Sequence, residues 1–78
     1  MVKIQLQEVF GKLSPYVKNR VMPVIDILLE RAEDLDSINR EDDVDYYEDE
    51  LESIMKEVRK IKYIEDQWQI MNAKLKNN

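Results

Sequence analysis

The chain has no cysteine and no histidine, and their absence removes several routes to stability and catalysis. Without cysteine no disulfide can form, and without either residue type the usual structural zinc sites are excluded. Acyl-transfer catalysis also lacks its usual thiol nucleophile and imidazole base, leaving only three serines besides tyrosine as hydroxyl groups. We therefore expect a protein that is not an enzyme and that holds neither a metal ion nor a cofactor.

Turn-forming residues and long apolar runs are also scarce. One glycine and two prolines are too few turn signals for a structure built from several strands. The longest apolar stretch, residues 24–29, contains Asp26 and is far too short to cross a bilayer. The N-terminus has no apolar run of signal-peptide length, and the lack of cysteine fits a reducing compartment. These features predict a cytoplasmic protein with no membrane association.

The chain length of 78 residues sets a limit on how much apolar surface can be buried. Residues 1–78 are expected to form a single helical domain. A domain of this size buries only about 60% of the surface that its unfolded chain exposes, which leaves its stability marginal. Because neither disulfides nor zinc can add stability, we expect self-association or a binding partner.

Apolar spacing in the C-terminal half predicts one long helix. Apolar residues recur at alternating intervals of three and four from Val44 to Leu75, which favours a helix over about Arg40 to Lys76. The succession Val58–Ile61–Ile64 contains two intervals of three, a stammer-like step in a coiled-coil-type seam. Asn39 is the expected N-cap, with acidic residues following it in the first turn.

The N-terminal half predicts two shorter helices. Residues 2–13 fit a short helix, although the apolar alternation at their start would also fit a brief strand. Ser14 followed by Pro15 predicts an N-cap with proline in the first turn of a second helix, which ends near Asp36. Pro23 lies inside this second helix and is expected to kink it or divide it.

The predicted fold is all-α, with kinked N-terminal helices and one long C-terminal helix in a hairpin. The long helix would span ~55 Å at ~1.5 Å per residue, whereas a compact globule of this length measures about 30 Å across. Apolar residues nevertheless continue to the end of that helix, so we expect a homodimer with an antiparallel four-helix core. An elongated monomeric hairpin is the alternative. The predicted core and dimer seam consists of Val24, Leu28, Leu51, Ile54, Val58, Ile61, Ile64, Trp68, Met71 and Leu75.

Charge is divided unevenly along the chain, although the net charge is only −5. Residues 26–52 contain thirteen acidic and two basic residues, a charge of −11. Residues 1–25 contain one acidic and four basic residues, and residues 53–78 contain three acidic and six basic residues, so each segment carries +3. Folding the helices into a hairpin would gather the negative charge at one end of the molecule.

A solvated charged face is the simplest explanation for these acids, because carboxylates suit a helix N-terminus. It does not account for Glu33, Asp34 and Asp36, which fall at a helix C-terminus, nor for an acidic run that reaches Glu52 without a compensating base. Dense like charge costs stability, so we expect these acids to bind a partner. Tyr46, an exposed aromatic residue among carboxylates, is the expected anchor. The predicted partner-binding residues are Glu30, Glu33, Asp34, Asp42, Asp45, Tyr46, Glu48, Asp49 and Glu52.

The short length, the expected dimer and the acidic run at residues 41–52 resemble a known class of proteins. These are small, acidic, helical, phage-encoded proteins that inhibit host DNA-transacting proteins by imitating DNA. The resemblance is one of type and not of motif. It implies a non-enzymatic inhibitor in the host cytoplasm, whose target is a basic DNA-binding protein such as a sliding clamp, a nucleoid protein or RNA polymerase.

Two other functions fit the same sequence. A structural or assembly module would use the apolar seam as a coiled-coil-like dimer interface, with charge fixing only the orientation of the two chains. An immunity or antitoxin-type protein would use the acidic surface against a basic toxin. Direct nucleic-acid binding is not expected, because the acidic end disfavours it and the basic cluster at residues 56–62 is explained by surface pairing along a helix.

Overall fold

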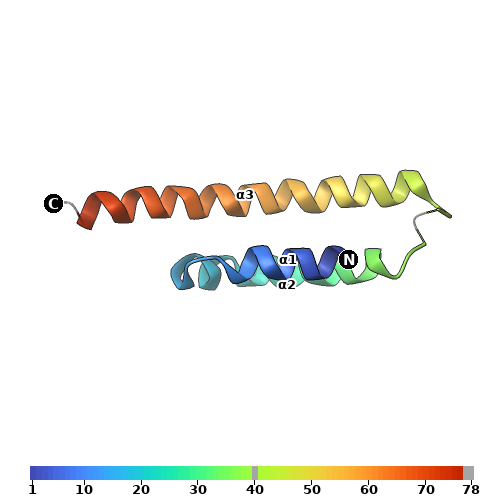
Figure 1. Ribbon diagram of the computed structural model, residues 1–78, viewed down its shortest axis with the longest axis horizontal. Coiled ribbons are helices and arrows are strands. Elements are labelled where there is room, and N and C mark those ends of the chain that lie inside the picture. The colour runs from blue at the N-terminus through green and yellow to red at the C-terminus, as the bar shows by residue number, and fades with distance from the viewer. Residues whose placement is uncertain (40, 77–78) are drawn as a thin grey trace.

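The computed structural model describes residues 1–39 and 41–76, which form three α-helices and no strand. The helices are α1 (Val2–Gly11), α2 (Pro15–Asp36) and α3 (Val44–Lys76). α2 runs back along α1, and α3 runs back along α2, giving a rod with extents of 56 × 17 × 17 Å (Figure 1). The predicted all-α class is confirmed, and the first residues of the chain are helix and not strand.

α2 begins after Ser14, with proline in its first turn, as the sequence predicts. The helix is continuous across Pro23, so of the two predicted outcomes, a kink or a division, the division is wrong. Pro23 has no N–H with which to bond the carbonyl of Asn19. Both residues are exposed, and water can therefore satisfy that carbonyl, which limits the cost of proline within a single turn.

α3 begins at Val44 and not at Arg40, which lies outside the described residues. The side-chain carbonyl of Asn39 accepts a hydrogen bond from the N–H of Glu41 at 3.1 Å, which holds a turn before the helix. The carboxylate of Asp43 accepts the N–H of Tyr46 at 3.2 Å, as an N-cap does. The capping role predicted for Asn39 therefore belongs to Asp43.

The core is a single apolar cluster to which all three helices contribute. α2 packs against both other helices, and its buried residues meet α1 on one side and α3 on the other. The most deeply buried large side chains include Leu6 of α1, Leu28 and Leu35 of α2, and Ile54 and Val58 of α3. Among the described residues, the buried apolar side chains are Val2, Leu6, Phe10, Leu13, Val17, Ile25, Leu28, Ala32, Leu35, Ile54, Val58 and Ile61.

The carboxylate of Glu65 on α3 accepts hydrogen bonds from the turn between α1 and α2. Glu65 accepts the N–H of Ser14 at 2.8 Å through one oxygen and the Ser14 hydroxyl at 2.7 Å through the other. The side-chain amide of Gln69 donates to the same carboxylate at 2.7 Å. Glu65 thus places a negative charge at the N-terminus of α2, where it is favourable. Beside this contact, the ring of Tyr16 stacks on Trp68 with centroids 5.9 Å apart.

These hydrogen bonds predict an acid-sensitive contribution to stability. Burial alone would raise the pKa of Glu65, but the bonds from Ser14 and Gln69 outweigh it and lower that pKa below its usual value. Because the folded pKa is depressed, the contribution is present above the pKa of the unfolded chain and is lost as pH falls through the folded pKa. We expect Glu65→Gln to cost about 1 kcal/mol at pH 7 and to reduce the loss of stability on acidification below the unfolded pKa. Urea unfolding at a series of pH values, followed by Trp68 fluorescence, measures both; an unchanged acid dependence would contradict the role of Glu65.

Candidate partner-binding surfaces

The acidic end of the rod carries the residues predicted to bind a partner. They lie at the end of α2, in the connection after it, and in the first turns of α3 (Figure 1). All nine predicted residues, Glu30, Glu33, Asp34, Asp42, Asp45, Tyr46, Glu48, Asp49 and Glu52, are exposed to solvent. The structure therefore brings them to one end of the molecule and leaves them accessible there.

On α3 three of the predicted acidic residues occupy the side that faces away from the core. Asp45, Asp49 and Glu52 follow one another at intervals of four and three residues, so they share one side of the helix. The buried Ile54 and Val58 lie on the opposite side, against α2. Three carboxylates thus project outward along the first turns of α3.

Part of the acidic end is used inside the chain, which corrects one inference from the sequence. The carboxylate of Asp36 accepts the N–H groups of Val2 at 2.9 Å and Lys3 at 3.0 Å, and so caps the N-terminus of α1. Glu33 forms an ion pair with the Lys3 ammonium at 3.0 Å. These two acids lie in the last turn of α2, where the helix dipole disfavours negative charge. Because α1 and α2 are antiparallel, the same carboxylates also lie beside the positive N-terminus of α1, which favours them. Their position is therefore explained by the fold.

A second correction concerns the acidic run on α3, which does have a compensating base. Arg31 of α2 forms an ion pair with Glu50 at 2.6 Å and also donates a hydrogen bond to the Ser53 hydroxyl at 3.0 Å. Both charged side chains are largely withdrawn from solvent, with exposed fractions of 32% and 24%. The sequence analysis missed this contact because Arg31 is separated from Glu50 by nineteen positions and belongs to another helix.

The remaining acids form the surface that is available to a partner. Within residues 1–39 and 41–76, no ion pair or side-chain hydrogen bond is found for the carboxylates of six predicted residues: Glu30, Asp34, Asp42, Asp45, Asp49 and Glu52. We call these six residues the acidic surface. Their charges are exposed at one end of the rod and are not neutralised by the described part of the chain.

The two adjacent tyrosines point in different directions. Tyr47 is partly buried and packs against the core, whereas the side chain of Tyr46 is 50% exposed. Tyr46 precedes Ile64 by eighteen residues, or about five turns at ~3.6 residues per turn, and so lies on the same side of α3. Tyr46 therefore borders the acidic surface but belongs to a different side of the helix from Asp45 and Glu52.

The predicted seam is buried in its middle and exposed towards its ends. Leu28, Ile54, Val58 and Ile61 are buried, and Leu51 and Trp68 are partly buried against the core. The other predicted seam residues, Val24, Ile64, Met71 and Leu75, are 38%, 44%, 62% and 68% exposed. The seam therefore continues beyond the part of α3 that its own chain covers.

The stammer-like step explains where the exposed part of the seam points. An interval of three residues falls about 60° short of a full helical turn, and an interval of four overshoots by about 40°. Because two threes occur in succession before Ile64, the later seam is rotated by about 60° from Ile61 towards the flank of the helix. Trp68 reaches Tyr16 from this position, but Ile64 and Met71 stay 44% and 62% exposed.

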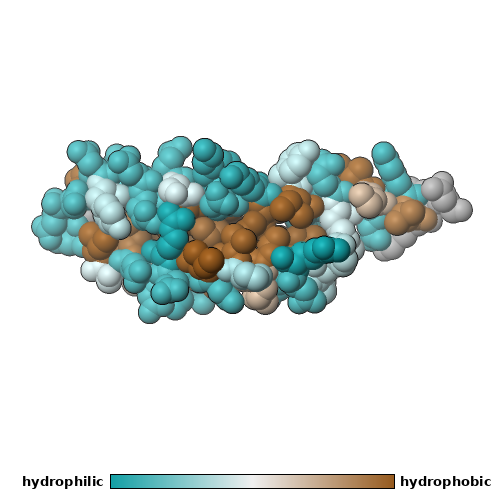
Figure 2. All heavy atoms as spheres, turned by 180° about the vertical axis from the view of Figure 1, so that it is seen from behind, coloured by the Kyte–Doolittle hydropathy of each residue, from teal (hydrophilic) through white to brown (hydrophobic). Residues whose placement is uncertain are grey.

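These exposed residues form an apolar strip that we call the bare flank. It consists of Val24 and Ile27 of α2, with Ile64, Met71 and Leu75 of α3. Val24 and Ile27 lie on the side of α2 from which Arg31 reaches α3, because they precede Arg31 by seven and four residues. α1 is in front of α2 in Figure 1, and the view from behind in Figure 2 shows apolar surface along the middle of the rod. α3 also extends beyond the turn that joins α1 and α2.

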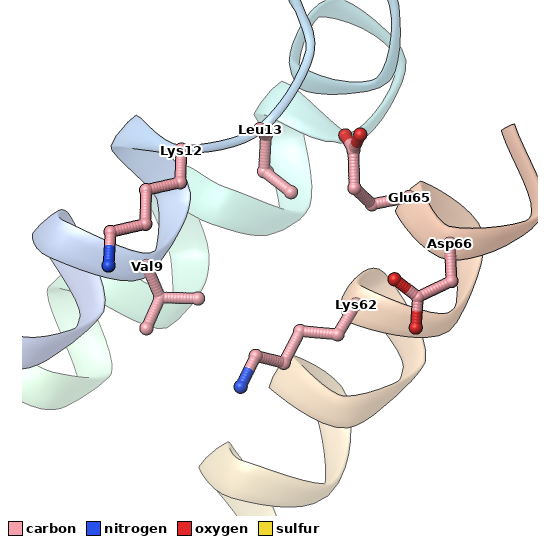
Figure 3. A pocket seen from close by; sticks show the side chains of 6 residues that line it. All are labelled: Val9, Lys12, Leu13, Lys62, Glu65 and Asp66. Atoms are coloured by element: carbon pink, nitrogen blue, oxygen red, sulfur yellow. The ribbon is translucent and has the colours of Figure 1, made fainter. Parts of the chain in front are cut away.

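A shallow, open hollow lies on the other flank, between the end of α1 and α3 (Figure 3). Its walls are Val9, Lys12 and Leu13 on one side and residues 62, 65 and 66 on the other. The Glu65 side chain turns towards the α1–α2 turn, where Ser14 holds it. Within residues 1–39 and 41–76, no three acidic side chains converge as metal ligands, and no helix is long and apolar enough to span a membrane.

Comparison of this chain with protein families, curated proteins and solved structures gives no match.

Proposed function

We propose that the protein is a non-enzymatic binding protein whose acidic surface occupies a basic, DNA-binding surface of another protein. The observation that supports this most directly is the set of six exposed carboxylates that have no ion partner among the described residues. On α3, Asp45, Asp49 and Glu52 succeed one another at a rise of about 4.5–6 Å along the helix axis. Phosphates of one DNA strand have a comparable spacing, with ~3.4 Å of axial rise and additional winding of the backbone.

The mechanism is competition for cationic side chains. The carboxylates pair with lysine and arginine residues that otherwise hold phosphates, and the negative end of the rod steers the encounter. Glu33 and Glu50 contribute less in this mechanism, because their charges are already balanced by Lys3 and Arg31. Such a protein would act as a phage-encoded inhibitor of a host protein. The kind of target is a sliding clamp, a nucleoid protein or RNA polymerase.

A capture experiment from bacterial lysate tests this proposal. The tagged protein is incubated at low and at high salt, with and without competing duplex DNA. We expect recovery of a basic DNA-binding protein at low salt, displaced both by high salt and by the duplex, because exposed charge pairs are screened. A partner that is retained in high salt and in the presence of DNA would contradict mimicry.

The second candidate function is a structural or assembly module, and it has its own supporting observation. The bare flank leaves five large apolar side chains exposed in a chain of 78 residues, and contiguous exposed apolar surface usually marks an interaction site. In this function a homodimer forms, with helices of two copies in an antiparallel bundle. The two functions are compatible on α3, where the acidic surface and the bare flank lie on different sides of the helix, whereas on α2 Ile27 of the bare flank adjoins Glu30 of the acidic surface.

A further inference from the structure

Most of the bare flank is suited to burial because Arg20, Arg31, Glu57 and Lys60 interact there with other side chains of the chain, whereas the unpaired Asp34 lies at its acidic end. On this flank of the α2–α3 pair, Arg31 is held by Glu50 and Ser53, and Glu57 forms an ion pair with Lys60 at 3.1 Å. The guanidinium of Arg20 lies 5.1 Å from the ring centre of Tyr16 and donates a hydrogen bond to its hydroxyl at 3.1 Å. Groups that keep a partner lose less free energy on leaving water than unpaired charges do.

The C-terminal part of α3 is also suited to burial, because it contains few charged groups. Residues 67–73 contain no charged side chain, although 37% of the whole chain is charged. Met71 and Leu75 are 62% and 68% exposed on the bare flank, beyond the reach of the α1–α2 turn. The segment is uncharged, and the described part of the chain leaves Met71 and Leu75 beside it uncovered on this flank.

We propose that this cover is a second copy of the same chain, packed antiparallel along the bare flank with the middle of its α3 opposite the middle of the first. This inference rests on the homodimer of the second candidate function and specifies its surface and direction. Two helices that each span residues 44–76 overlap fully when residue 60 of one lies opposite residue 60 of the other. The end of each α3 then lies beside the start of the other, where Tyr46 is exposed on the same flank.

Charge favours the antiparallel direction. The first turns of α3 belong to the segment that carries −11, and the rest of the helix belongs to a segment that carries +3. A parallel pair would place the two acidic segments side by side, whereas the antiparallel pair sets each acidic segment against a basic one. The outward-facing Asp45 and Glu52 stay accessible in this arrangement. The dimer therefore presents two acidic surfaces at opposite ends and can hold two basic partners at once.

Cysteine cross-linking tests the direction, because the chain has no cysteine of its own. Lys60→Cys, Tyr46→Cys and Leu75→Cys each replace an exposed residue, and the products are treated with a short bismaleimide. We expect Lys60→Cys to form covalent dimers alone, and Tyr46→Cys to do so only when it is mixed with Leu75→Cys. Dimers of Tyr46→Cys alone would indicate a parallel pair, and dimers of Ile70→Cys without those of Lys60→Cys would indicate contact through the helix ends; either result overturns the inference while the homodimer stands.

Sedimentation equilibrium tests the surface and separates the two proposals. We expect the unmodified chain to have twice its monomer mass of 9.4 kDa. Ile27→Lys should raise the dimer dissociation constant by about tenfold or more. Ile4→Lys is the matched control, since Ile4 and Ile27 are 53% and 56% exposed but Ile4 lies on α1. Equal effects of the two variants overturn the proposed surface. A monomeric unmodified chain overturns both this inference and the homodimer, and leaves the proposal for the acidic surface standing.

Discussion

Leu28→Ala is expected to lower the free energy of unfolding by about 2–5 kcal/mol. Leu28 is only 1% exposed and lies on α2, the helix that packs against both others, so the truncated side chain leaves a cavity with little room to collapse. A domain of 78 residues has a total stability of about 4–12 kcal/mol at ~0.05–0.15 kcal/mol per residue, so the variant should lose a large part of it. Urea unfolding monitored by far-UV circular dichroism gives the difference.

The matched control for this substitution is Ile4→Ala. Ile4 is 53% exposed on α1, and alanine is the better helix former, so this variant should change stability by less than about 1 kcal/mol. Measuring both variants at one protein concentration keeps any contribution from self-association equal. Similar losses for Leu28→Ala and Ile4→Ala would mean that the core is not centred on α2.

The double variant Asp45→Lys, Asp49→Lys is expected to weaken binding of the captured partner by at least about tenfold at low salt, because attractive charge pairs become repulsive ones. Asp45 and Asp49 are exposed, and neither contributes to the ion pairs that hold α3 to α2. Lysine is a good helix former, so the far-UV circular dichroism should stay unchanged apart from a small effect of losing an acid in the first turn. Titration with the purified partner gives the affinities.

A second double variant controls for net charge. Glu8→Lys with Asp66→Lys brings about the same change in charge, from −5 to −1, at exposed sites outside residues 26–52. If the acidic surface binds the partner by position, this control should keep most of the affinity of the unmodified chain. Equal loss of affinity in the two double variants would mean that only the overall charge matters, and the proposal of a specific acidic surface would be abandoned.

The exposed end of α3 connects the two proposed functions. A protein with one acidic surface can only block a partner, whereas an antiparallel dimer with an acidic surface at each end can also bring two partners together. Which behaviour dominates depends on the strength of the dimer contact relative to the concentration of the chain.

Local patterns in the sequence determined the class of the fold. The apolar intervals of three and four predicted α3, and Ser14 with Pro15 predicted the start of α2, because helix periodicity and capping depend on residues only a few positions apart. The start of α3 was missed by about four residues, since Asn39 and Asp43 are both suitable caps and their local sequences do not distinguish them. The N-terminal segment was open to two assignments, and packing against α2 made it a helix.

Contacts between distant residues were decided only by the tertiary structure. Asp36 caps α1 across 34 positions and Glu65 accepts the N–H of Ser14 across 51, and no local pattern marks either pair. The same is true of Arg31 and Glu50, whose ion pair changes how the acidic segment is interpreted. The sequence by itself determined the two longer helices, the uneven charge and the continuous seam. Only the packing of α2 against α3 decided which part of that seam is covered, because α2, with 22 residues, is too short to cover all 33 residues of α3.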